Sequence, residues 1–294
     1  MRLSDLPLPD AATRRLSRLP FMSPPSPRDT NRRVLITGGA SGLGLALATA
    51  FLERGDRVTI ADLAPADERP ASIPSDARYL RLDVRSEDEW ITARKEIDEI
   101  WGGLDVLVNN AGIAQGGRIE MLTEEDWRQI TDINLLGVAR GCRTFVPQLK
   151  EQGHGLIVNT ASLAGLVHPP TMSSYTAVKA AVVAISESLR WELEPFGVDV
   201  SVICPSFFRT NLASSLNSSD PAAAGFASKL IDRADRGADE IAAEVMSALE
   251  VGEFLILPDP EARKSYRGKR MLPAVYTKTM TEMGRKFANS TRRG

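Results

Sequence analysis

Tyr175 and Lys179 are the two side chains of this sequence whose types and spacing are best suited to acid–base chemistry. They stand four positions apart in a segment predicted to be helical, so they share one helix face. A free phenol has a pKa of about 10 and is a poor base at neutral pH. A neighbouring ammonium group stabilises the phenolate and lowers that pKa, which makes tyrosine a usable general acid or base. On this spacing alone, the two residues could equally be surface side chains without a catalytic role.

Ser162 adds a third group to this pair. It follows a predicted strand at 156–160 and precedes Tyr175 by 13 positions. A hydroxyl at this point can hydrogen-bond a substrate oxygen while the charge on that oxygen changes. The three side chains together therefore indicate proton transfer to and from a substrate oxygen.

A glycine-rich segment, Thr37–Gly44, joins the first predicted strand to a predicted helix. Glycines let the backbone turn tightly and approach a pyrophosphate, while the helix directs its first amides at the phosphates. Glycines also serve ordinary turns, but this segment stands in the first strand-to-helix turn, where a dinucleotide site needs it. The residues expected at the phosphates are Gly38, Ala40, Ser41, Gly42, Leu43 and Gly44.

Asp62 ends the second predicted strand, 18 positions after Gly44. An acidic residue here can accept hydrogen bonds from an adenosine ribose and would repel a 2′-phosphate. No Lys or Arg lies in the glycine segment to compensate, so we expect NAD rather than NADP. The alternative is a solvated surface aspartate.

Further polar positions follow the next two strands. Asp83 and Val84 are expected near the adenine, and Asn110, Ala111 and Gly112 follow the fourth strand. Open α/β sheets bind ligands beyond the carboxyl ends of their strands, and all these positions fall on that edge.

The elements that must position these groups alternate along the chain. Continuous apolar strands separated by helices indicate a doubly wound, Rossmann-like parallel sheet of seven strands, covered on both faces, in one α/β domain over 33–258. Strands are predicted at 34–37, 57–61, 78–82, 105–108, 156–160, 198–203 and 253–257. Helices are predicted at 43–54, 86–101, 124–140, 142–151, 173–194 and 238–250.

Composition places the chain among soluble enzymes. The 294 residues are 43% apolar and 25% charged, as in ordinary globular proteins. Two distant cysteines, Cys142 and Cys204, offer neither a disulfide framework nor metal spacing, so we expect buried thiols and no metal site. No apolar run is long enough to span a bilayer and no secretory signal is evident, which predicts a cytoplasmic protein.

The two ends of the chain differ from its middle. Residues 1–32 are rich in Pro and Arg and are expected to be a disordered arm, and Met22 within it leaves the true start open. The basic extension, 259–294, carries ten Lys or Arg and three acidic residues. Basic ends on an acidic body do not indicate nucleic-acid binding. In the extension, Leu272, Val275, Thr279 and Met283 fall near helical spacing, and we expect docking on the body or a subunit in preference to membrane-surface contact.

In combination and order, these motifs resemble the short-chain dehydrogenase/reductase family over about 34–258. The resemblance rests on Thr37–Gly44, Asn109–Gly112, Ser162 and Tyr175-Thr-Ala-Val-Lys179. It implies hydride transfer between a secondary alcohol or ketone and NAD, with Tyr175 as acid/base and with Tyr175 and Lys179 also contacting the cofactor. It implies a water-linked proton relay at Asn134 and nicotinamide contacts at Pro205 and Thr210. Ser206 departs from the Pro-Gly pattern usual after the sixth strand.

The resemblance also implies a substrate lid at about 207–236 and a homodimer or homotetramer. Phe207, Phe208, Leu212 and Phe226 are candidate pocket walls, which favours an apolar substrate, or else they anchor the segment. The helix at 173–194 is apolar nearly all round and is the expected subunit contact. Two other readings stay open: a non-catalytic NAD-binding or sensing protein, and an epimerase or dehydratase, which usually has a longer substrate domain.

Overall fold

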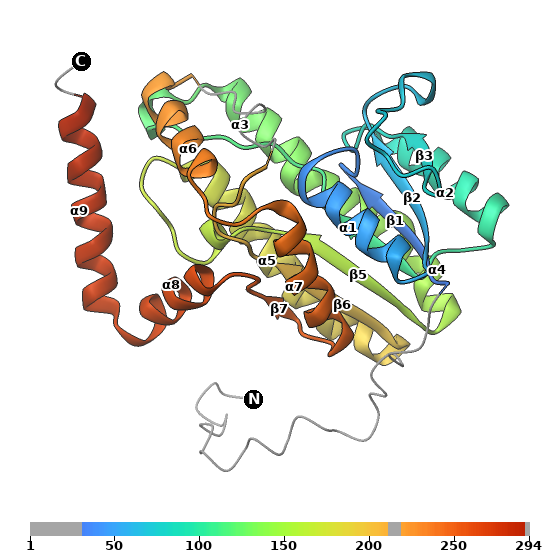
Figure 1. The fold of residues 1–294 in the computed structure, drawn as a ribbon. Helices are drawn as coiled ribbons and strands as arrows, with labels where there is room; N and C mark the ends of the chain where they lie inside the picture. The colour runs from blue at the N-terminus through green and yellow to red at the C-terminus, as the bar shows by residue number, and fades with distance from the viewer. Residues whose placement is uncertain (1–30, 211–218, 292–294) are drawn as a thin grey trace, which may run out of the picture.

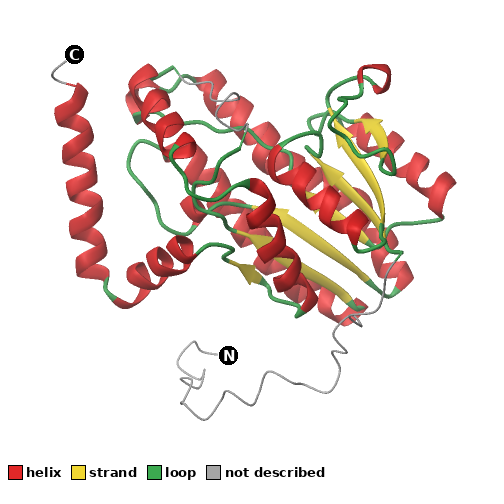
Figure 2. Cartoon of the chain, viewed as in Figure 1, coloured by secondary structure: helices red, strands yellow, loops and turns green. Residues whose placement is uncertain are grey.

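The computed structural model describes residues 31–210 and 219–291. Its centre is a seven-stranded sheet in the order β3-β2-β1-β4-β5-β6-β7, in which every neighbouring pair is parallel (Figures 1 and 2). The predicted Rossmann-like α/β fold is confirmed. The strands are β1 (Arg33–Thr37), β2 (Arg57–Asp62), β3 (Arg78–Arg81), β4 (Val106–Asn109), β5 (Gly155–Thr160), β6 (Val198–Ile203) and β7 (Leu255–Ile256).

Helices cover both faces of the sheet, as its continuous apolar strands require. On one face lie α1 (Gly42–Glu53) and α7 (Ala238–Glu250), which pack on each other and on alternate residues of β1 such as Val34 and Ile36 (Figure 1). The other face is covered by α2 (Glu87–Trp101), α4 (Gly137–Gln152) and α5 (Ser173–Leu193). The remaining helices are α3 (Glu124–Thr131), α6 (Pro221–Asp232), α8 (Pro260–Met271), α9 (Pro273–Thr291) and the short η3 (Ala66–Glu68), η4 (Ile119–Met121), η5 (Asp132–Leu136), η6 (Leu163–Gly165) and η7 (Glu194–Phe196).

The strand order reverses beside β1, which pairs with β2 on one side and with β4 on the other. Crossovers therefore leave in opposite directions at this point and open a crevice beyond the carboxyl ends of the strands. The arrowheads of β1 and β5 point toward the side of the molecule where α6 and α9 lie (Figure 1). The segments that follow β1, β2, β4, β5 and β6 meet at this edge, which we call the carboxyl edge.

The helices after β4 differ from the prediction. The break expected at Gly141 is wrong, because α4 runs unbroken from Gly137 to Gln152. A Cβ at Gly141 would collide with Asn109 Oδ1 and lie 2.8 Å from the Trp90 ring, so this glycine serves close packing. The irregularity lies earlier, in the π-helical turn η5, which includes Asn134.

The predictions for the two ends of the chain and for the expected lid can be compared with the structure only in part. Nearly all of the arm at 1–32 lies outside the described residues, as does 211–218 of the expected lid. The described part of that lid contains α6. The basic extension forms two helices, α8 and α9, and the apolar stripe predicted for it is wrong, because Leu272 and Val275 are 56% and 59% exposed. Among the described helices, none has the length and apolar character needed to cross a membrane.

Candidate active site

Tyr175 and Lys179 lie on the buried face of α5, where their side chains are 8% and 4% exposed. Lys179 Nζ lies 5.9 Å from the centre of the Tyr175 ring and donates a hydrogen bond to the Thr160 carbonyl at 2.8 Å. Burial lowers the pKa of Lys179 to about 8, because a buried ammonium loses its hydration. The lysine is thus fixed beside the phenol and can change its charge within an accessible pH range.

The pKa of the Tyr175 phenol also differs from its ordinary value. Burial raises the pKa of Tyr175, and its hydrogen bond with Ser162 acts in the opposite direction. The net direction is opposite to the lowering expected from Lys179, since burial penalises the phenolate more than the Ser162 hydrogen bond stabilises it. In this state the tyrosine is therefore held as a phenol, the form that donates a proton.

Ser162 reaches the phenol because η6 folds back onto α5 directly after β5. The Ser162 side chain caps this short helix and accepts a hydrogen bond from Ala164 N at 3.1 Å. Gly165 permits the close approach, because a Cβ there would lie 2.7 Å from the Lys179 backbone carbonyl. The three residues singled out from sequence are therefore brought together.

Asn134 is fully buried within η5. Its Oδ1 accepts from Ile113 N at 2.9 Å and its Nδ2 donates to Ile113 O at 2.9 Å. A Cβ on Gly112 would lie 3.2 Å from Asn134 Oδ1 and 3.6 Å from Lys179 Nζ, so both polar atoms surround the same backbone position. The amide of Asn134 thus fixes the segment after β4 against the lysine.

The glycine segment is held by the same region of the chain. Thr37 Oγ1 accepts from Asn110 N at 3.0 Å and from Ala111 N at 3.1 Å, and Asn110 Nδ2 donates to Gly38 O at 3.1 Å. Gly38 has a φ of 62°, and a Cβ on it would lie 2.7 Å from Ala111 Cα. The segment after β4 and the first turn of α1 are thus locked together through backbone that only glycine allows.

The N-terminus of α1 is suited to an anion. The N-cap residue, Ser41, makes no side-chain capping bond, and the first turn contains no acidic residue. The first amides of a helix carry partial positive charge and seek acceptors. A phosphate is a suitable acceptor at this position.

Asp62 lies beside the glycine segment at the end of β2. Its Oδ2 accepts from Ala40 N at 2.9 Å and its Oδ1 accepts from Leu63 N at 2.8 Å. Each carboxylate oxygen has further lone pairs, so the group can still accept from two hydroxyls. The carboxylate is therefore rigidly placed where an adenosine ribose was expected.

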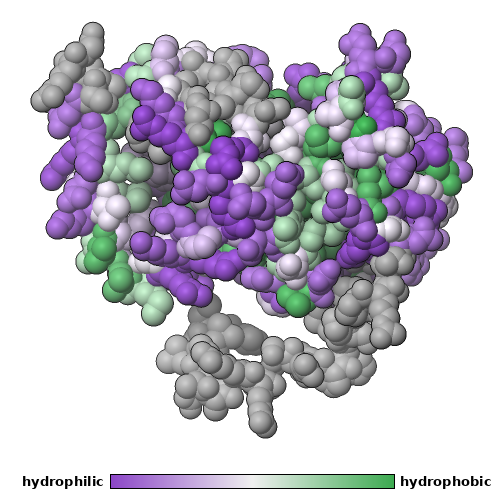
Figure 3. All heavy atoms as spheres, viewed as in Figure 1, coloured by the Kyte–Doolittle hydropathy of each residue, from purple (hydrophilic) through white to green (hydrophobic). Residues whose placement is uncertain are grey.

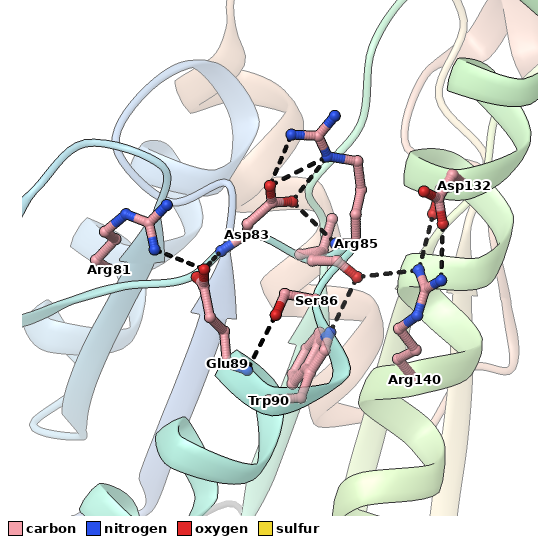
Figure 4. Close-up of polar contacts among 9 residues, drawn as sticks. Arg81, Asp83, Arg85, Ser86, Glu89, Trp90, Asp132 and Arg140 are labelled. Carbon is pink, nitrogen blue, oxygen red and sulfur yellow. Dashed lines mark hydrogen bonds and ion pairs between the residues drawn. The ribbon is translucent and has the colours of Figure 1, made fainter.

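Arg81 at the end of β3 and Arg85 in the loop that follows are engaged with acidic partners (Figure 4). Arg81, which pairs with Asp62 in the sheet register, directs its guanidinium to Glu89 Oε1 at 2.6 Å. Arg85 binds both oxygens of Asp83, and this pairing holds the pKa of Asp83 below its ordinary value. The Asp83 carboxylate therefore points to Arg85 in this structure.

Val84 is fixed through its backbone at the same place. The Val84 carbonyl accepts from Trp90 Nε1 at 3.1 Å and from Arg140 at 3.3 Å, as Figure 4 shows around the labelled Trp90 and Arg140. The Val84 side chain is 8% exposed and lies against Gly137. The loop after β3 is therefore rigid and presents an apolar residue near the expected adenine position.

The structure of the loop after β6 explains how a serine is accommodated at position 206, where the family pattern has glycine. Ser206 N and Oγ both donate to the Asp259 carboxylate, at 2.9 and 2.7 Å. Pro205 O accepts from Leu163 N at 2.9 Å, which joins this loop to η6. Thr210 lies over the glycine segment, because a Cβ on Gly42 would be 2.6 Å from Thr210 Oγ1. The serine is thus accommodated by an acidic partner from the extension.

The apolar residues expected to form the walls of the substrate pocket lie in different environments. Phe208 is 8% exposed and packs in the core with α1 and α7, so it anchors the loop, whereas Phe207 is 41% exposed. Leu212 and the side chain of Phe226 lie outside the described residues.

A buried polar network around Gln115 was not predicted. Ser174 Oγ donates to Gln115 Oε1 at 2.6 Å, and Gln115 Nε2 donates to Asp126 O at 3.1 Å. Nearby, Arg118 Nε donates to Asp220 Oδ2 at 2.7 Å, which holds the N-terminus of α6 and lowers the pKa of Asp220 to about 2. Sequence gave no signal for these partners, which lie up to 102 positions apart.

Comparisons with known proteins agree with this geometry. The model of the short chain dehydrogenase family matches residues 32–221. The chain is 38% identical over 178 residues to a 3-alpha-(or 20-beta)-hydroxysteroid dehydrogenase of Mycobacterium tuberculosis, covering 60% of this chain and 68% of that protein. It is 34% identical over 251 residues to a CLA biosynthesis dehydrogenase/reductase of Lactiplantibacillus plantarum, covering 78% and 88%.

Among solved structures, a short chain dehydrogenase/reductase from Burkholderia phymatum in complex with NAD superposes with a TM-score of 0.76 at 29% identity. The superposition covers 82% of this chain and 93% of that one. The family match extends over more than half of the sequence and includes Ser162, Tyr175 and Lys179. The chain belongs to the short-chain dehydrogenase/reductase family of oxidoreductases.

Proposed function

We propose that this protein is an NAD-dependent oxidoreductase that interconverts a secondary alcohol and a ketone, with Tyr175 as its acid/base. One observation carries the proposal. The phenol of Tyr175 is buried between Ser162 and Lys179, and that lysine in turn lies beside Gly112 and the locked glycine segment. An acid/base group and a dinucleotide cradle thus share one edge of the sheet.

The residues present fit a nicotinamide dinucleotide. The glycine segment and the uncapped first turn of α1 would hold the pyrophosphate, because a Cβ at Gly38 has no room there. Asp62 would hold the adenosine ribose, beside Asp83 and Val84. Lys179, Tyr175, Pro205 and Thr210 would hold the nicotinamide end. Asp62 is anionic and the neighbouring arginines are paired, so NAD is favoured over NADP.

In the oxidation direction, Ser162 orients the alcohol oxygen and Tyr175 accepts its proton. Bound oxidised NAD would supply a hydride acceptor for the carbinol carbon and a positive charge that would favour the phenolate. Lys179 stabilises that phenolate, and its hydrogen bond to Thr160 O fixes its position. Asn134 holds the segment at Ile113, from which water would carry the proton to solvent. Reduction of a ketone runs in reverse, with Tyr175 donating the proton.

The proposed substrates are apolar. The named relatives include a hydroxysteroid dehydrogenase, and the covering segment carries Phe207 in an exposed position. This supports a hydrophobic secondary alcohol in preference to a sugar or an acid.

The test is an absorbance screen for NADH formation across secondary alcohols, repeated with NADP. We expect turnover with NAD at a higher kcat/KM than with NADP. Tyr175→Phe should reduce kcat by at least about a hundredfold, the range for loss of a general base, while calorimetry shows unchanged NAD binding. Near-normal turnover by this variant would contradict the mechanism.

A matched control is Tyr79→Phe, which removes a phenol that donates to the Ala64 carbonyl. Tyr79 lies on β3, which is separated by three strands from β5, the strand that precedes Ser162. It should leave kcat unchanged. Tight NAD binding with no turnover of any alcohol or ketone would instead support the non-catalytic NAD-binding alternative.

A further inference from the structure

The extension is fastened to the carboxyl edge at its start. Asp259 caps α8 by accepting from Ala262 N at 2.7 Å, and the same carboxylate accepts both bonds from Ser206. Asp259 is 5% exposed. A carboxylate that is buried and fully hydrogen-bonded fixes the first turn of α8 to the loop after β6.

Further contacts join the extension to the loop after β5, which contains Ser162. Lys269 Nζ donates to Leu166 O at 2.6 Å, and His168 N donates to Tyr276 Oη at 3.2 Å. Ala262 is fully buried against Leu163 and Val167. The expected docking of the extension on the body therefore occurs, and it occurs on the loop that presents Ser162.

The far end of α9 meets the loop after β4. The Arg118 guanidinium lies 6.0 Å from the centre of the Phe287 ring, in a cation–π arrangement. The same guanidinium holds Asp220 at the start of α6. Helix α9 therefore extends from the loop after β5 to the loop after β4 and passes outside the carboxyl edge (Figure 1).

One face of α9 is turned toward the body. Tyr276, Met280, Met283 and Phe287 are half-buried, and their spacing of four, three and four positions places them on one face, which we call the inner face. Most other residues of α9 are exposed, and the outward side of the helix is largely hydrophilic (Figure 3). The inner face is thus apolar, and its two ends contact the loop after β5, which contains Ser162, and the loop after β4, which contains Gly112.

We propose that the inner face of α9 is the outer wall of the substrate site and binds the distal apolar part of a long or bulky secondary alcohol or ketone. The inference rests on the proposed function and adds the substrate class to it. Tyr276 and Phe287 fasten the wall at its two ends. Met280 and Met283, between them, contact the substrate, because unbranched thioether side chains adapt to irregular apolar surfaces.

The experiment compares unbranched secondary alcohols from 2-butanol to 2-decanol with NAD. In the wild-type enzyme, kcat/KM should rise by up to about fourfold for each methylene group buried against the inner face. The double variant Met280→Ser, Met283→Ser should lower the 2-decanol to 2-butanol ratio of kcat/KM by at least about tenfold, with the value for 2-butanol nearly unchanged. Deleting 273–294 should do the same.

The matched control is Leu272→Ser, Val275→Ser, which changes two exposed apolar residues, one directly before α9 and one in its first turn. It should keep the wild-type ratio. An unchanged ratio in both the double variant and the deletion would overturn the inference. So would a deletion that alters only the oligomeric mass, because the inner face would then be a subunit contact.

Binding separates this inference from the proposed reaction. With NADH present, calorimetry should show tight binding of 2-decanone by the wild type and weakened binding by the double variant. If no alcohol is oxidised but this difference is found, the proposed reaction fails and the wall stands. If binding of 2-decanone is equal in both proteins, the wall is rejected.

Discussion

Replacing Lys179 by methionine measures how much free energy the folded chain loses by burying the charged lysine side chain. Methionine has a similar length and no charge, so it removes the ammonium without leaving a large cavity. The pKa of Lys179 falls from 10.5 to about 8 because the side chain is almost fully buried. Each pKa unit corresponds to about 1.4 kcal/mol, so the charged form is disfavoured in the folded chain by about 3 kcal/mol.

The pH dependence follows from this lowered pKa. Below pH 8 both the folded and the unfolded wild-type chain carry the charge, so the penalty is fully present. Between pH 8 and 10.5 the folded chain loses its proton first, which relieves the penalty and raises wild-type stability. The methionine variant lacks this effect. The unfolding free energy of the wild type minus that of the variant should therefore increase by about 3 kcal/mol from pH 7 to pH 10.5.

Urea unfolding of both proteins at a series of pH values measures this difference. Effects of the substitution that do not depend on pH, such as the change in packing, cancel because only the change with pH is compared. Lys95→Met, at an exposed position on α2, should show no such change relative to wild type. A difference between wild type and Lys179→Met that stays constant over this pH range would refute a lowered lysine pKa.

Three further changes have defined outcomes. Asn134→Leu should lower the free energy of unfolding by about 2–4 kcal/mol, measured in urea, because both Ile113 backbone groups lose their partner. Ser206→Ala should lower it by about 1–2 kcal/mol through loss of the hydroxyl bond to Asp259, and an unchanged midpoint would contradict this. Trp191→Lys, at a 62% exposed position on α5, should reduce the mass found by light scattering, because the homodimer or homotetramer expected from the family resemblance would form through this helix.

Sequence predicted the features that depend on local pattern. The strands after which Gly38, Asn110 and Ser162 stand were placed within a residue or two, because parallel strands buried on both faces are continuously apolar. Tyr175 and Lys179 share a face simply because four positions are about one helical turn. The order of these elements then places the motifs on one edge.

Features that depend on distant partners were not predictable in the same way. In the sequence, Ser206 stands where the family pattern has glycine, and nothing near it explains the difference. In the fold, its hydroxyl donates a hydrogen bond to Asp259, 53 positions away. The inner face of α9 was misassigned because the surface that it meets lies on loops after β4 and β5. The direction of the Tyr175 pKa depends on burial, which no spacing of residues encodes.

The most direct test of the central claim follows the hydrogen that leaves the alcohol. A secondary alcohol carrying deuterium at its carbinol carbon is incubated with the wild-type enzyme and NAD, and the deuterium content of the NADH formed is measured by mass spectrometry. We predict one deuterium in each NADH, and formation of NADH by Tyr175→Phe that is at least about a hundredfold slower, although that variant still binds NAD. NADH formed without deuterium, or formed equally fast by the variant, would contradict hydride transfer with Tyr175 as the base.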